Sequence, residues 1–121
     1  MDVAEIVANT LRRNGGEYVS FAELQRDATA YEDNQWSGDY AMEVKPGSNI
    51  FIWFGMSPDA IAAIDSLIKR KVVDLVPSSE MVYMVDGIMA NAPIAKQARN
   101  YKKPRWMPVT LYRGDNWDDL P

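Results

Sequence analysis

The side chains best suited to bind an anionic partner are gathered in residues 95–106, AKQARNYKKPRW. The basic residues of this segment are Lys96, Arg99, Lys102, Lys103 and Arg105. Lysine and arginine neutralise phosphates and aromatic rings stack on bases, so the segment predicts phosphate contacts with stacking by Tyr101 or Trp106. Two other interpretations stay open. The segment could be a solvated connector whose aromatic residues anchor it to the core, or it could grip an acidic protein surface.

A second basic run, Lys69-Arg70-Lys71, ends the helix that we predict over residues 57–71. These side chains would add phosphate contacts, and Ser66 is the residue of this helix best suited to reach a base edge. Asp59 and Asp65 of the same helix would repel phosphates. The alternative for the run is a favourable interaction of its cations with the C-terminal end of the helix dipole.

Charge is unevenly distributed along the 121 residues, whose formal net charge is −4. Residues 1–41 contain eight acidic and three basic side chains, whereas residues 69–113 contain nine basic and three acidic ones. The last eight residues add three aspartates. This division predicts a polar molecule with one face for an anionic partner, and chance segregation on a solvated surface is the alternative.

Several kinds of chemistry are excluded by composition, because the chain has no cysteine and no histidine. It can form no disulfide, no thiolate or imidazole metal site and no Cys–His or Ser–His nucleophile. The spacing of the carboxylates indicates no acid–base pair in a cleft, and residues 115–119 lack the pattern of a calcium loop. We therefore expect no enzyme, no cofactor and no metal. No apolar run is long enough to cross a bilayer, so we expect a cytoplasmic protein with no membrane partner.

Hydrophobic periodicity and turn residues predict a single α+β domain. Ser20 opens a capping box in which Glu23 reaches back to the Ser20 amide, and Ser57-Pro58 begins a later helix. The predicted helices cover residues 2–14, 20–31 and 57–71. The predicted strands are residues 49–54, a hairpin of Val72–Val76 with Met81–Val85, and residues 107–111. Residues 90–100 are a candidate for a short helix that Pro93 interrupts.

The order of helix, short link, helix, helix and hairpin resembles the winged helix-turn-helix superfamily. The residues that carry this resemblance are Ser20–Tyr31, Ser57–Lys71 and Val72–Asp86. It implies three helices with a β-hairpin wing over residues 1–87, a C-terminal extension over residues 88–121 and an acidic tail over residues 114–121. The pattern is generic to the superfamily. The chain departs from it through about twenty residues between the second and third helices, where such domains have a short turn.

The resemblance and the basic half favour a small, non-enzymatic, DNA-associated regulator or accessory factor. The alternative is an acidic protein-interaction module, such as a viral or mobile-element inhibitor of a host protein. In that case Trp117 and Asp118 of the tail would anchor a partner, unless Trp117 packs back on its own domain. Proteins of this superfamily frequently pair, so a homodimer is a further expectation. A continuous basic stripe from residues 69–71 to 96–105 would favour DNA, and two separated patches would favour protein binding.

Overall fold

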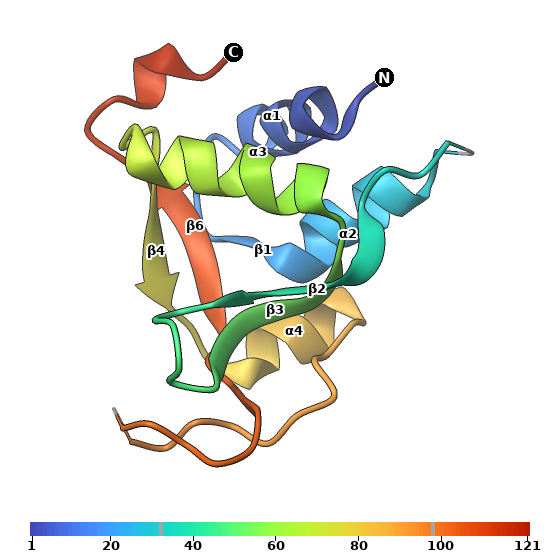
Figure 1. Cartoon of the computed structure of the whole chain (residues 1–121). Coiled ribbons are helices and arrows are strands. Elements are labelled where there is room, and N and C mark those ends of the chain that lie inside the picture. Colours follow the sequence, from blue (N-terminus) through green and yellow to red (C-terminus); the bar gives the residue numbers. More distant parts are fainter. Residues whose placement is uncertain (32, 98) are drawn as a thin grey trace.

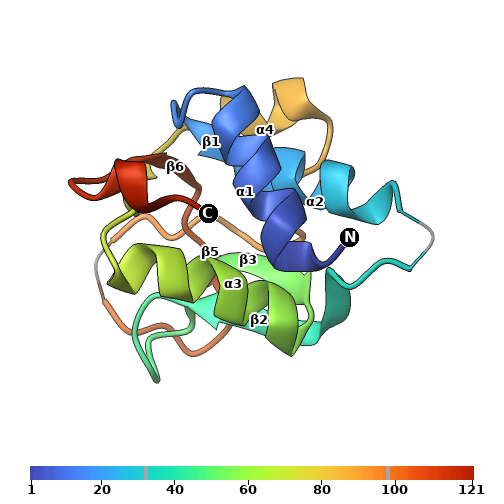
Figure 2. The ribbon, with the colours of Figure 1, turned by 90° about the horizontal axis from the view of Figure 1, so that it is seen from above.

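The computed structural model describes residues 1–31, 33–97 and 99–121 and contains helices packed against two small sheets (Figure 1). The chain therefore has an α+β fold. The first three helices are α1 (Val3–Arg13), α2 (Phe21–Thr29) and α3 (Pro58–Lys69). Figure 2 shows α1 lying across the top of the molecule, with α2 and α3 on either side of it.

The helices begin where the sequence places their N-caps. The Ser20 and Ser57 hydroxyls accept the backbone N–H groups of Glu23 and Ala60, and Asp2 caps α1 in the same way. The capping box at Ser20 is only half formed, because the Glu23 carboxylate accepts hydrogen bonds from Arg13 and Asn14 instead of the Ser20 amide.

One antiparallel sheet joins segments far apart in the chain. It contains β1 (Val19–Ser20), β6 (Val109–Arg113) and β4 (Val73–Pro77), in the order β1-β6-β4. The strand predicted over residues 107–111 is thus confirmed, two residues further along. Because β6 is the central strand, the C-terminal part of the chain contributes to the fold itself.

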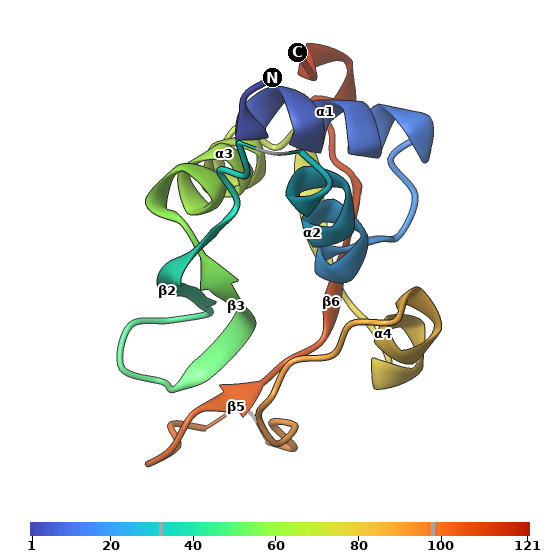
Figure 3. The same ribbon diagram turned by 90° about the vertical axis from the view of Figure 1, so that its right-hand side faces the viewer.

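The second sheet positions the basic segment. It pairs β2 (Ser37–Glu43) antiparallel to β3 (Ile50–Met56), and β5 (Arg105–Trp106) adds to β3 in parallel. The strand predicted over residues 49–54 is confirmed. Figure 3 shows this sheet on one side of the molecule and β6 on the other, with β5 at the lower end.

The predicted β-hairpin is wrong in its second strand. Val72–Val76 corresponds to β4, but Met81–Val85 lies within a short helix, α4 (Glu80–Asp86). Ser79 caps its start, and Gly87 ends it with a φ of 86°, a left-handed conformation that glycine adopts readily. The partner of β4 is β6, so residues 78–108 separate two strands that we expected to join through a tight turn.

The remaining C-terminal residues have little regular structure. No helix forms over residues 90–97 or 99–100 of the candidate short helix, and Ala98 lies outside the described residues. Ile94 forms an isolated bridge to Trp106, and a 3-10 turn, η1 (Trp117–Asp119), lies in the tail. In the described part of the chain, no helix combines the length and the apolar character needed to span a bilayer.

An aromatic cluster joins the β2-β3-β5 sheet to α4. The Trp53 ring stacks on Tyr83 with centroids 5.1 Å apart, and Trp106 packs edge-on against Tyr83 at 4.9 Å. All three residues are buried, and the Trp106 indole donates a hydrogen bond to the Ile52 carbonyl. Because Trp106 directly follows the basic segment, the cluster fixes where that segment leaves the core.

Candidate nucleic-acid interface

Tyr101 organises the segment that we call the basic loop, the described residues of 95–105. Its hydroxyl accepts hydrogen bonds from the backbone N–H groups of Lys96 (3.1 Å) and Gln97 (3.0 Å). The guanidinium carbons of Arg99 and Arg105 each lie 4.9 Å from the centre of its ring. These cation–π contacts hold two cations beside one half-buried aromatic ring. The loop is therefore ordered by its own side chains.

The turn between β2 and β3 anchors the basic loop to the body of the protein. The Tyr101 amide donates to the Ser48 carbonyl (2.9 Å), and the Asn49 side-chain amide donates to the Tyr101 carbonyl (2.9 Å). The Arg105 amide donates to the Asn49 carbonyl (2.8 Å). Asn49 has a φ of 58°, which asparagine tolerates better than most residues. Sequence reasoning missed the role of Asn49, and its only signal was a turn-forming residue before an apolar strand.

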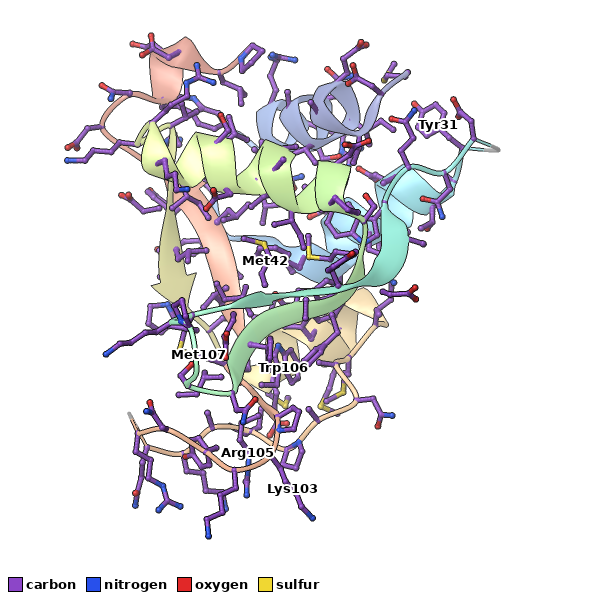
Figure 4. The ribbon with its side chains drawn as sticks, viewed as in Figure 1. Tyr31, Met42, Lys103, Arg105, Trp106 and Met107 are labelled. Atoms are coloured by element: carbon purple, nitrogen blue, oxygen red, sulfur yellow. The ribbon has the colours of Figure 1, made fainter. Side chains whose placement is uncertain are left out.

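The charge of the basic loop is not neutralised within the described part of the chain. None of its five basic side chains has a carboxylate oxygen within 4.0 Å there. No acidic residue occurs in the sequence between Gly87 and Arg113. The loop also contributes no exposed large hydrophobic side chain. Figure 4 shows Lys103 and Arg105 at the lower end of the molecule, with Trp106 above them in its interior.

The surroundings of Tyr101 change its acidity. Desolvation raises the pKa of the phenol, but the hydrogen bond from the Gln97 amide and the neighbouring Arg99 lower it by more. The net result is a pKa below the ordinary value for tyrosine. The backbone N–H groups that bond to the hydroxyl and the Arg99 guanidinium thus favour the ionised phenol.

The stacking role expected for Trp106 requires correction. Its side chain is 1% exposed, because β5 pairs with β3 and turns the indole inward against Trp53 and Tyr83. No base can reach it. Of the two readings of the aromatic residues, the structure bears out anchorage for Trp106, while the Tyr101 ring is already in contact with two guanidinium groups.

In the second basic run, the Lys69 and Arg70 side chains interact with other residues of the protein. Lys69 forms an ion pair with Asp65 at 2.8 Å, and the Arg70 guanidinium lies 3.4 Å from the Asp119 carbonyl. The Asn116 side chain donates to the Arg70 carbonyl, and its backbone N–H donates to the Lys71 carbonyl. Ser66 is exposed on α3, beside Asp65. The acidic tail thus covers the end of α3 at which phosphate contacts were expected.

The two tail residues expected to anchor a partner, Trp117 and Asp118, differ in their exposure to solvent. Trp117 is half-buried and packs against the core, and a Cβ at Gly16 would come within 2.8 Å of its ring. Asp118 is exposed in η1. Trp117 therefore packs back on its own domain, as the alternative interpretation held, and only Asp118 faces solvent.

The two basic clusters lie at opposite ends of the molecule. Figures 1 and 3 both place the C-terminal end of α3 near the top and the segment around β5 at the bottom, with the sheets between them. Residues 69–71 and the described part of residues 96–105 therefore form two separated basic patches and not one continuous stripe.

Comparison with known proteins adds no assignment to this site. No family model, curated protein or solved structure matches the chain. Among the described residues, no group of three acidic side chains is placed to hold a metal ion. The functional proposal therefore depends on the chemistry of the basic loop.

Proposed function

We propose that the protein is a small, non-enzymatic, DNA-associated factor that holds the phosphate backbone with its basic loop. One observation carries this proposal. Five cationic side chains, without carboxylate partners in the described residues, lie on an ordered loop that exposes no large apolar side chain. A protein interface normally has an apolar or aromatic centre, whereas phosphate binding requires only cations and hydrogen-bond donors.

Contact with the backbone follows from the types of side chain present. Arg99 and Arg105 are held beside Tyr101, and an ordered guanidinium can donate two parallel hydrogen bonds to one phosphate. Lys96, Lys102 and Lys103 are exposed and act as point charges. Such contacts position a protein on DNA without reading its sequence, so we expect binding with little base preference.

This proposal keeps the order of elements of the winged-helix resemblance but not the roles of its third helix and its wing. The superfamily has the order helix, link, helix, helix and antiparallel pair of strands. We assign these positions to α1, β1, α2, α3 and the β4–β6 pair, and we treat the β2–β3 hairpin and residues 78–108 as insertions. In this interpretation α3 is not the reading helix, because Asp59 and Asp65 lie on it and the tail occupies its basic end. The longer insertion carries the basic loop in place of a wing tip.

The test is a salt titration of binding to a mixed-sequence duplex with matched charge variants. If all five basic residues contact phosphates, the plot of log affinity against log salt has a slope of about −4.5. The triple variant Lys96→Gln/Lys102→Gln/Lys103→Gln should reduce that slope by about 3 units. The control Lys69→Gln/Arg70→Gln/Lys71→Gln changes the net charge equally and should leave the slope unchanged.

Two results would count against the proposal. One is the absence of salt-sensitive binding up to about 100 µM protein, the weak end of nonspecific affinities. The other is an equal loss in both triple variants, which would show that net charge alone governs the binding.

A protein-interaction module is the second candidate, and the separation of the two basic clusters favours it. In that case the basic loop would grip a carboxylate-rich protein surface. Poly-glutamate provides the comparison, because it has negative charge without phosphates. Tighter binding to poly-glutamate than to a duplex of equal total charge, lost in the loop variant, would favour this candidate over DNA.

A further inference from the structure

The short helix α4 exposes a patch of apolar side chains with no partner in the described chain. Four of the nine large hydrophobic side chains exposed in the described residues lie within residues 81–89. They are Met81, Met84, Val85 and Met89, exposed to 60%, 55%, 83% and 45%. Apolar groups gathered in this way indicate an interaction site, whereas single exposed ones do not.

Helical spacing places three of these side chains on one face of α4, whereas Met89 follows the end of the helix. Met81, Met84 and Val85 stand at positions i, i+3 and i+4, which are neighbours on a helix surface. Tyr83 points the opposite way, into the core, where its hydroxyl donates to the Val109 carbonyl at 2.6 Å. The inner face of α4 is therefore fixed, and its outer face is apolar.

Opposite charges stand at the two ends of α4. Glu80 is exposed in the first turn of α4. At the other end, the exposed Arg26 guanidinium donates to the Asp86 carbonyl at 2.9 Å. Among the described residues, neither Glu80 nor Arg26 has an oppositely charged partner within 4.0 Å. The Asp86 carboxylate is half-buried and accepts the Ser20 hydroxyl, so it leaves the guanidinium available.

We propose that α4 is the contact surface of a homodimer, in which two copies of the helix pack antiparallel about a two-fold axis. A helix of seven residues is about 10 Å long, so antiparallel packing brings Glu80 of each copy to the Arg26 end of the other. The self-complementary order of acid, apolar face and base is what an isologous interface requires. Methionine side chains adapt their shape readily to such a contact.

The dimer accounts for the patch better than other occupants do. An acidic peptide would meet Glu80 at one end of the face, and a basic one would meet Arg26 at the other. A second copy satisfies both ends with the same two residues. A stable dimer needs about 800 Å² from each partner, so the three apolar side chains of α4 form the centre of the contact and neighbouring residues complete it.

The test is sedimentation equilibrium of the full chain from about 5 to about 500 µM, where a dimer shows a concentration-dependent mass. We expect Val85→Asp to remain monomeric, and Val44→Asp, a matched change at an exposed valine in the β2–β3 turn, to associate like the unmodified protein. Glu80→Arg and Arg26→Glu should each weaken association by about tenfold or more, and the double exchange should restore most of it.

Three results would overturn the proposal. The first is a monomer at every concentration, which leaves the patch to a different partner. The second is a dimer that Val85→Asp does not affect, which places the contact on another surface. The third is a double exchange no better than either single one, which excludes the antiparallel arrangement. Far-UV circular dichroism of each variant separates loss of association from loss of folding, and DNA binding can fail without affecting these outcomes.

Discussion

The Tyr83 hydroxyl completes the link between α2 and the central strand of the β1-β6-β4 sheet. The register Val19↔Leu111 and Ser20↔Thr110 makes Phe21 and Val109 the next opposing residues. They do not bond directly. Instead, the Tyr83 hydroxyl accepts the Phe21 N–H (3.2 Å) and donates to the Val109 carbonyl (2.6 Å). Tyr83 therefore replaces one ladder bond and fixes α4 at the same time.

Replacing Tyr83 with phenylalanine keeps the ring and removes only the hydroxyl. The Phe21 N–H and the Val109 carbonyl are then left buried and without a partner. One such group costs about 1–3 kcal/mol, so we expect Tyr83→Phe to lower the free energy of unfolding by about 2–3 kcal/mol at neutral pH. A domain of this size is typically stable by about 5–15 kcal/mol, so the variant should still fold.

The same hydroxyl gives stability a pH dependence above pH 10. Burial raises the pKa of Tyr83 by more than the hydrogen bond from the Phe21 N–H lowers it, and the nearby Asp86 charge adds a smaller increase. The folded protein then keeps the phenolic proton above about pH 10, where the unfolded chain loses it. The contribution of Tyr83 is therefore complete below pH 10, and it decreases by about 1.4 kcal/mol per pH unit above that value.

Urea unfolding followed by tryptophan fluorescence measures both effects. The difference between the unmodified protein and Tyr83→Phe should be largest at pH 7 and should shrink by about 1 kcal/mol between pH 10 and 11. Tyr40→Phe is the control, because this tyrosine is 59% exposed. A difference below about 0.5 kcal/mol at pH 7, or one that stays constant to pH 11, would refute the reasoning.

Further predictions concern the caps, the tail and the basic loop. Ser57→Ala removes the N-cap of α3 and should cost about 1–2 kcal/mol in urea unfolding. Gly114→Ala places a Cβ 2.3 Å from the Lys71 carbonyl oxygen and should cost about 1–3 kcal/mol in the same assay, because both sides of the clash are backbone. In an absorbance titration, the Tyr101 step, identified by its loss in Tyr101→Phe, should move upward in pH in Arg99→Gln.

The parts of the fold that the sequence predicts are those decided by neighbours in the chain. A serine hydroxyl capping an N–H three residues on, as at Ser20 and Ser57, depends on local geometry alone. The apolar stretch that forms β3 depends on residue type and length in the same way. These predictions hold because no distant residue competes for the same groups.

The second wing strand fails for a non-local reason. MVYMV suits a strand by composition, but β4 pairs with β6, which lies beyond residue 108, and not with these residues. Local signals then decide for a helix, with the Ser79 cap at one end and Gly87 at the other. The order of helices and strands along the chain shows which elements follow one another. It does not show which strands far apart in the sequence pair with each other.

In the candidate site, too, some features depend on neighbours in the chain and others on distant residues. The charge of the basic loop is evident from composition, whereas the bonds from Tyr101 to Ser48 and Asn49 cross about fifty residues and leave no local pattern. For Trp106 the sequence leaves two alternatives, stacking on a nucleic-acid base or anchorage to the core. The orientation of Trp106 is set by pairing of β5 with β3, which the sequence around it does not encode.

The charge distribution limits how this protein can bind a polyanion. The tail packs against the basic end of α3, so the positive charge without partners lies mainly at one end of a molecule whose net charge is −4. Phosphates beyond the reach of the basic loop would meet an acidic surface and be repelled. The contact with DNA should therefore be short, and the salt slope of one chain should not exceed that of five charges. A dimer through α4 would present two such loops, and a steeper slope at concentrations that favour dimers would then connect the two proposals.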